Sequence, residues 1–134
     1  MGLDVGDKRI GVALGDPQGI LASPLTIIDR TGDREDIEAI TDIIDRNQVG
    51  RIIVGLPVSM NGSLGMQARK VEDFTRALRK RVEVPVEFRD ERLSTVSAKR
   101  LMHTVRKTRK TGKTRHDSMA AALILQSYLD EFSA

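Results

Sequence analysis

The chain has 134 residues, of which 40% are hydrophobic and 31% charged, and it carries a formal net charge of +3. These values are ordinary for a soluble globular protein and predict one compact domain, residues 1–134. The absence of cysteine excludes disulfides, thiolate zinc sites and a cysteine nucleophile. No apolar run reaches the ~18 residues that a membrane span requires. We therefore expect a cytoplasmic protein with no membrane partner.

The first part of the chain predicts an antiparallel meander of three strands. Short turns separate three apolar segments, at 2–6, 9–15 and 20–28. Pro24 lies inside the third segment and cannot donate to a ladder, so this strand is expected at a sheet edge or a bulge. A helical period follows from Arg34 to Gln48, and Asp33 is its expected N-cap.

The second part of the chain alternates strands and helices. Apolar runs predict a fourth strand at 51–57 and a fifth at 84–91. Apolar spacing predicts a helix ending near Arg81, another from about Ser94, and a last helix over 118–132. The predicted fold class is α/β, with one five-stranded mixed sheet flanked by helices. Right-handed crossovers place strands four and five on the far side of strand one, which is then central.

Three acidic residues stand where ligands of α/β sheets collect. Asp4 interrupts the apolar first strand, Glu91 follows the fifth strand, and Asp117 opens the last helix. Carboxylates gathered in one cleft repel one another unless a hard divalent cation such as Mg²⁺ neutralises them. Such ions activate water for phosphodiester cleavage. Asp4, Glu91 and Asp117 are therefore our candidate metal ligands and catalytic residues.

Basic residues are concentrated in one segment, and this asymmetry predicts a polyanionic partner such as nucleic acid. Residues 99–116 contain no acid, whereas the rest of the chain has 14 basic and 19 acidic residues. Lys8 and Arg9, in the first turn, are further candidates for phosphate contacts, although both could be solvated turn residues. The candidates within the segment are Lys99, Arg100, Arg106, Lys107, Arg109, Lys110, Lys113 and Arg115.

Each of these features also has a structural interpretation that the sequence leaves open. Asp117 could only cap the last helix. Glu91 could form a surface ion pair with Arg89 or Arg92. Asp4 could bind the amides of the following turn. The basic segment could be a solvated face.

Four segments together resemble one known family, the RuvX family (also called YqgF) of bacterial RNase H-like nucleases. They are "LDVGDKRIGVALGD", "IIVGLP", "DERLST" and "HDSMAAALILQSYL", in family order and over nearly the whole chain. The resemblance implies an RNase H-like fold, Mg²⁺ or Mn²⁺ as cofactor, and Asp4, Glu91 and Asp117 as catalytic acids. Family members usually begin several residues further before this aspartate, so a short first strand is expected.

The same resemblance implies the surroundings of the acids. Residues 55–57, the "GLP" segment, would form the floor of the site. Arg92, Ser94 and Thr95 would flank Glu91, and Arg92 would be a further contact to nucleic acid.

The implied activity is that of an endonuclease that matures the 5′ end of pre-16S ribosomal RNA, leaving a 5′-phosphate and a 3′-hydroxyl. Ribosomal precursor particles are then expected partners. An older label for the family is Holliday junction resolvase, which would act on four-way DNA as a symmetric dimer. Monomer and homodimer both remain open. Two further alternatives are an actin-like phosphate-binding domain, which the "DVGDKRIGVAL" turn resembles, and a non-catalytic factor of ribosome assembly.

Overall fold

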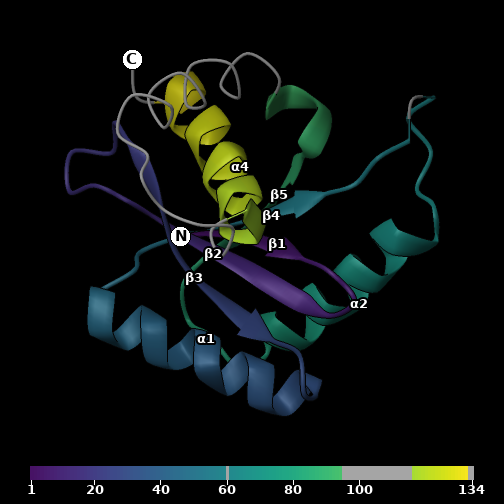
Figure 1. Cartoon of the computed structure of the whole chain (residues 1–134), viewed down its shortest axis with the longest axis horizontal. Helices are drawn as coiled ribbons and strands as arrows, with labels where there is room; N and C mark the ends of the chain where they lie inside the picture. The colour runs from purple at the N-terminus through teal and green to yellow at the C-terminus, as the bar shows by residue number, and fades with distance from the viewer. Residues whose placement is uncertain (60, 95–115, 133–134) are drawn as a thin grey trace.

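The computed structural model describes residues 1–59, 61–94 and 116–132, which form one sheet with helices on both of its faces (Figure 1). Within these ranges no helix is long and apolar enough to cross a membrane. The elements in chain order are β1 (Gly2–Val5), β2 (Arg9–Gly15), β3 (Ala22–Asp29), α1 (Asp33–Asn47), β4 (Ile52–Leu56), α2 (Met66–Arg79), β5 (Val86–Asp90), the 3₁₀ turn η1 (Glu91–Ser94) and α4 (His116–Phe132).

The strand order β3-β2-β1-β4-β5 confirms the predicted α/β fold with a central first strand. The β1–β2 and β2–β3 pairs are antiparallel, whereas β1–β4 and β4–β5 are parallel. The first strand is short, as expected, with four residues. The carboxyl ends of β1, β4 and β5 consequently meet at one edge of the sheet.

Pro24 occupies an edge strand and lies at an irregularity, so both expected arrangements occur together. β3 is the outer strand of the sheet, and its register with β2 shifts between Val12 and Ala13. Val12 pairs with Thr26 and Ala13 with Pro24. A proline is tolerated here because the bulge and the free edge remove the demand for its missing N–H.

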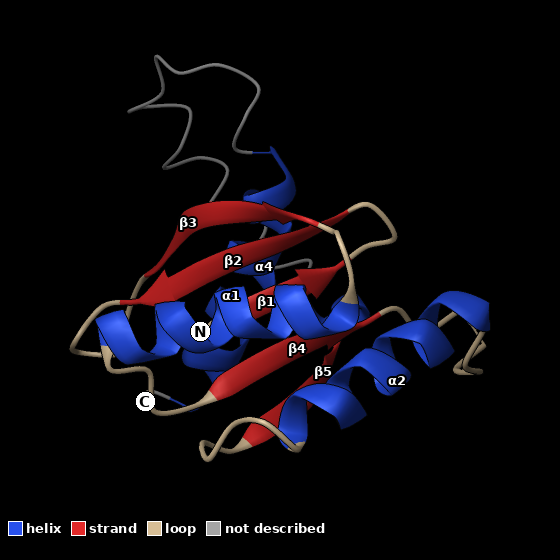
Figure 2. Ribbon diagram, turned by 90° about the horizontal axis from the view of Figure 1, so that it is seen from below, coloured by secondary structure: helices blue, strands red, loops and turns tan. Residues whose placement is uncertain are grey.

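The two faces of the sheet are covered differently (Figure 2). Helices α1 and α2 bury one face, where Leu3 and Val5 belong to the larger apolar core with Ile40 and Phe74. Helix α4 covers the other face and packs on β1, β2 and β3. Because side chains of a strand alternate between faces, Asp4 projects toward the α4 side, opposite Leu3 and Val5.

Helix starts differ from the sequence prediction in two places. Asp33 is the first residue of α1 rather than its N-cap, which is Gly32 without a side-chain cap. The prediction was wrong because the Asp33 carboxylate accepts a hydrogen bond from Arg30 instead. Helix α4 begins at His116, two residues before the predicted start. Of the helix predicted from Ser94, residues 95–115 lie outside the described residues.

Candidate active site

Asp4 lies where the two central parallel strands stop pairing. β1 pairs with β4 only through Gly2 and Leu3, whereas its pairing with β2 continues through Asp4, opposite Gly11. The chain leaves β1 toward β2 on one side, and β4 lies on the other, so this point is a topological switch of the sheet. Ligands of open α/β sheets bind at such points. The half-buried Asp4 therefore occupies a position suited to binding.

Glu91 brings a second carboxylate to the same edge. It is half-buried and opens η1 immediately after β5. Burial raises the pKa of Glu91, and the negative charges of Asp4 and Asp90 raise it further. Two acids that are 87 positions apart in the sequence thus interact electrostatically across the carboxyl ends of the strands.

Gly55 of β4 makes room for this arrangement. A Cβ at Gly55 would lie 3.0 Å from Oε1 of Glu91 and would overlap the Ile124 side chain of α4. Any larger residue here would push against both. The "GLP" segment expected to form the floor of the site thus begins with a glycine, which leaves the space that Glu91 and Ile124 of α4 occupy.

Asp90 is kept ionised beside Glu91 by Arg92. The Arg92 guanidinium donates to both Asp90 carboxylate oxygens, with Nε 3.1 Å from Oδ1 and Nη2 2.6 Å from Oδ2, and the Arg92 amide also donates to Oδ1. These bonds lower the pKa of Asp90. Arg92 Nη1 also donates to the Ser59 carbonyl at 3.3 Å, which ties η1 to the loop after β4. Sequence analysis missed this clamp, although the Asp-x-Arg spacing permits it.

Arg89 fastens β5 to α4. Its Nε donates to Ser127 Oγ at 2.7 Å, and its Nη2 lies 2.5 Å from Glu131 Oε2. The Arg89 side chain is only 11% exposed, so this contact is part of the packing between the strand and the helix. Arg89 was considered a surface partner for Glu91, and the structure instead shows it bound to α4.

Asp117 lies in the first turn of α4, and its side chain is outside the described part of the structure. The course of the helix is nevertheless clear from its contacts with glycines. Leu129 lies beside Gly15, and Ala121 lies on Gly2. Since Gly15 and Asp4 lie in opposite directions from Gly2 along the sheet, the earlier turns of α4 run toward Asp4. Among the described residues, no group of three acidic, histidine or cysteine side chains could hold a metal.

Two of the predicted phosphate-binding residues are exposed at the turn after β1. Lys8 and Arg9 are both exposed, and Arg9 Nε lies 3.9 Å from Oδ1 of Asp29. Arg92 is also exposed and is bound as described above. The eight basic residues between Lys99 and Arg115 lie outside the described residues.

Comparison with known proteins decides the family. A model of the family described as "RuvX: Holliday junction resolvase" matches residues 1–131. The chain belongs to the RuvX family. A relative from Thermoanaerobacter pseudethanolicus is 49% identical over 97% of this chain and 94% of its own length. A relative from Syntrophomonas wolfei is 43% identical over 97% and 92%, respectively. Both carry the name "Putative pre-16S rRNA nuclease".

Solved structures show that the RuvX chain has the fold of RuvC-like, RNase H-type resolvases. Thermus thermophilus RuvC in complex with a Holliday junction aligns with a TM-score of 0.63, at 16% identity over 99% of this chain and 95% of the other. The fowlpox virus Holliday junction resolvase aligns with a TM-score of 0.55, at 13% identity over 98% and 97%. At these identities the likeness concerns the fold.

The residues at this edge fit a divalent cation. Carboxylate oxygens are the ligands that Mg²⁺ and Mn²⁺ prefer. Burial raises the pKa of Glu91 most, and a cation between Asp4 and Glu91 would offset the charge repulsion that raises it further. The donor set of the described residues is therefore chemically suited to such an ion, and an additional ligand could come from the first turn of α4.

Proposed function

We propose that this chain is a metal-dependent endonuclease that hydrolyses phosphodiester bonds in structured RNA, and that its substrate is the 5′ end of pre-16S ribosomal RNA. The observation that carries the proposal is the carboxylate pair of Asp4 and Glu91 at one edge of the sheet, where burial raises the pKa of Glu91 and the charge of Asp4 raises it further. The relatives' names support the substrate. The reaction would take place in the cytoplasm, on ribosomal precursor particles.

In this proposal Asp4, Glu91 and Asp117 hold Mg²⁺ or Mn²⁺. The ion, when bound, supplies Lewis-acid activation of water and of the scissile phosphate. Asp4 fixes the geometry because a central strand is the most rigid part of the sheet. Glu91 is oriented by η1, which Arg92 ties to the loop after β4.

Basic residues would hold the RNA backbone in register with these acids. Lys8 and Arg9 stand at the turn that follows Asp4, and the basic segment from Lys99 to Arg115 precedes Asp117 in the chain. Contacts to phosphates position a nucleic acid without reading its sequence. The affinity should therefore fall steeply with salt concentration.

The test is cleavage of a 5′-labelled rRNA precursor by wild type and by Asp4→Asn. With Mg²⁺ present, we expect the variant to lose on the order of 10³-fold in rate, since an amide is a poor ligand for a hard cation. Asp45→Asn is the matched control. Asp45 is exposed on α1, so this variant should cleave at the wild-type rate. Undiminished cleavage by Asp4→Asn would contradict the proposal. Binding without cleavage, in either metal, would favour a non-catalytic assembly factor.

A second candidate substrate is a four-way DNA junction, which the family description and the RuvC-like fold favour. Resolution requires two coordinated incisions, so this candidate predicts a symmetric dimer with two sites. Competition between labelled pre-rRNA and an immobile four-way junction separates the two substrates. Paired symmetric cuts in DNA by a dimer, with no RNA cleavage, would replace the ribosomal substrate with the junction.

A further inference from the structure

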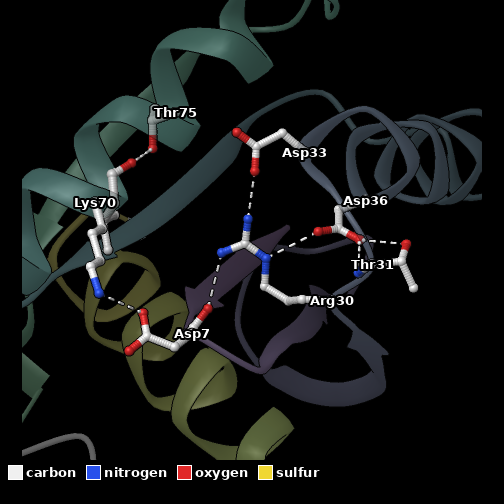
Figure 3. Close-up of polar contacts among 9 residues, drawn as sticks. Asp7, Arg30, Thr31, Asp33, Asp36, Lys70 and Thr75 are labelled. Carbon is white, nitrogen blue, oxygen red and sulfur yellow. Dashed lines mark hydrogen bonds and ion pairs between the residues drawn. The ribbon is translucent and has the colours of Figure 1, made fainter.

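Arg30 links the turn after β1 to the first turns of α1 (Figure 3). It stands between β3 and α1, and each of its nitrogens has a different acceptor. Nη1 donates to the Gly6 carbonyl at 3.1 Å, Nη2 to Asp33 Oδ1 at 2.7 Å, and Nε to Asp36 Oδ2 at 3.0 Å. The planar, branched guanidinium can satisfy three such acceptors at once, whereas a lysine ammonium cannot do so in this geometry.

Asp36 fixes the orientation of the Arg30 guanidinium, which also contacts the Gly6 carbonyl. Asp36 is 1% exposed, and its other oxygen accepts the Thr31 amide at 3.1 Å. The ring of Phe74 lies 4.9 Å from the Arg30 Cζ, which adds a cation–π contact on one face. The guanidinium is thus held by the carboxylates of Asp36 and Asp33 and by an aromatic ring, and its Nη1 donates to the turn.

The turn that Arg30 holds is the continuation of the strand that carries Asp4. Beyond Leu3, β1 has no ladder partner in β4. The Gly6 carbonyl is bound by Arg30, and the Arg30 amide donates to the Lys8 carbonyl at 2.9 Å. The end of β1 is therefore held by its pairing with β2 and by the bond from Arg30 to Gly6. This end lies close to the point where the pairing of β1 with β4 stops.

We propose that Arg30 and Asp36 form a positioning unit that sets the place of the Asp4 carboxylate for metal binding. This inference rests on the proposed function. Replacing a buried ion pair by apolar residues is often neutral for stability, so stability alone gives little reason for one here. Outer partners that orient a ligand commonly change metal affinity or activity by about 10- to 100-fold when removed. Arg30 acts on Asp4 through the backbone of residues 5 and 6.

Three variants of the full chain test the proposal. Arg30→Met with Asp36→Leu removes both charges and leaves no unpaired buried ion. Arg30→Lys keeps a cation beside Asp36 but loses the branched geometry. Ile40→Val is the control, because Ile40 is fully buried in α1 and its shortening should lower the Tm by a few degrees without touching the turn.

The readouts are the Kd for Mn²⁺ by electron paramagnetic resonance, kcat and KM on the rRNA precursor, hydrogen exchange of the 4–9 amides, and thermal unfolding. We expect the double variant and Arg30→Lys to raise the Kd for Mn²⁺ and lower kcat by about 10-fold or more, with KM within about twofold. Exchange at residues 4–9 should accelerate, and Ile40→Val should keep wild-type values of Kd and kcat.

The outcomes separate this inference from the proposed function. Wild-type Kd and kcat in a folded double variant, or in Arg30→Lys if the double variant does not fold, would overturn the positioning role and leave the nuclease untouched. If Ile40→Val weakens Mn²⁺ binding and lowers kcat to the same extent, the effect is one of general destabilisation, and the positioning role is overturned. If wild type itself neither binds Mn²⁺ nor cleaves, the proposed function fails, and this inference fails with it.

Discussion

Two acids on opposite faces of the sheet, Asp36 and Glu91, lie in different electrostatic surroundings. Asp36 is 1% exposed and lies 3.0 Å from the Arg30 guanidinium, so its negative charge is compensated within the fold. Glu91 is half-buried, and its pKa is raised by burial and further by the carboxylates of Asp4 and Asp90. A compensated buried acid holds neighbouring segments in place, whereas acids gathered against one another fit the binding of an external cation.

The same acid-to-amide substitution should therefore have opposite effects at the two places. Asp36→Asn leaves the Arg30 cation beside a neutral group, and we expect it to lower the free energy of unfolding by about 3 kcal/mol. Urea denaturation at neutral pH measures this value. Arg34→Gln, which removes only the exposed Arg34–Glu38 pair, should change it by less than about 0.5 kcal/mol. If Asp36→Asn lowers the free energy of unfolding no more than Arg34→Gln does, the Arg30 charge does not compensate the buried Asp36 carboxylate.

Gly55 tests whether the site depends on the close approach of Glu91 to β4. Gly55→Ala should destabilise by about 1–3 kcal/mol through overpacking against Ile124, and it should weaken Mn²⁺ binding by displacing Glu91. Gly50→Ala is the matched control, because nothing lies within 4 Å of a Cβ there. Calorimetry with and without Mn²⁺ reports both effects. Equal stability and equal Mn²⁺ affinity of the two alanine variants would show that the site does not depend on Gly55.

Glu91→Gln should stabilise the metal-free protein. Because the pKa of Glu91 in the folded state is raised above its ordinary 4.5, ionisation opposes folding once the pH exceeds the raised value. We expect a gain of about 1 kcal/mol, or a few degrees in Tm, at pH 8 in EDTA. The gain should shrink as the pH falls and vanish below about pH 4, where both states are protonated. Thermal melts over this pH range give the Tm of both proteins. A lower Tm for Glu91→Gln than for wild type at pH 8 would contradict the assigned repulsion.

Strand order and the central place of Asp4 were predictable because they depend on apolar periodicity and on the handedness of crossovers. The edge position and bulge at Pro24 followed from its missing N–H. These features are local or topological, and each is encoded within a few residues. The meeting of Asp4 and Glu91 then followed from the common edge of parallel strands.

Contacts that depend on side-chain reach were not predictable. The sequence predicted Asp33 as an N-cap, but Arg30, three residues earlier, donates a hydrogen bond to its carboxylate. The link from Arg30 to Gly6 spans 24 positions and ends on a backbone carbonyl, which leaves no trace in a sequence pattern. Arg92 was considered a possible partner of Glu91, and its pairing with Asp90 could not be chosen from the sequence. The roles of Asp117 and of the basic residues from Lys99 to Arg115 remain predictions.

The most direct measurement is a crystal structure of the chain soaked with Mn²⁺, read through the anomalous signal of the metal. We expect anomalous density in contact with carboxylate oxygens of Asp4, Glu91 and Asp117 together. Density that lies elsewhere at saturating Mn²⁺, or Asp4 and Glu91 oxygens held by protein cations in its place, would contradict a shared metal site.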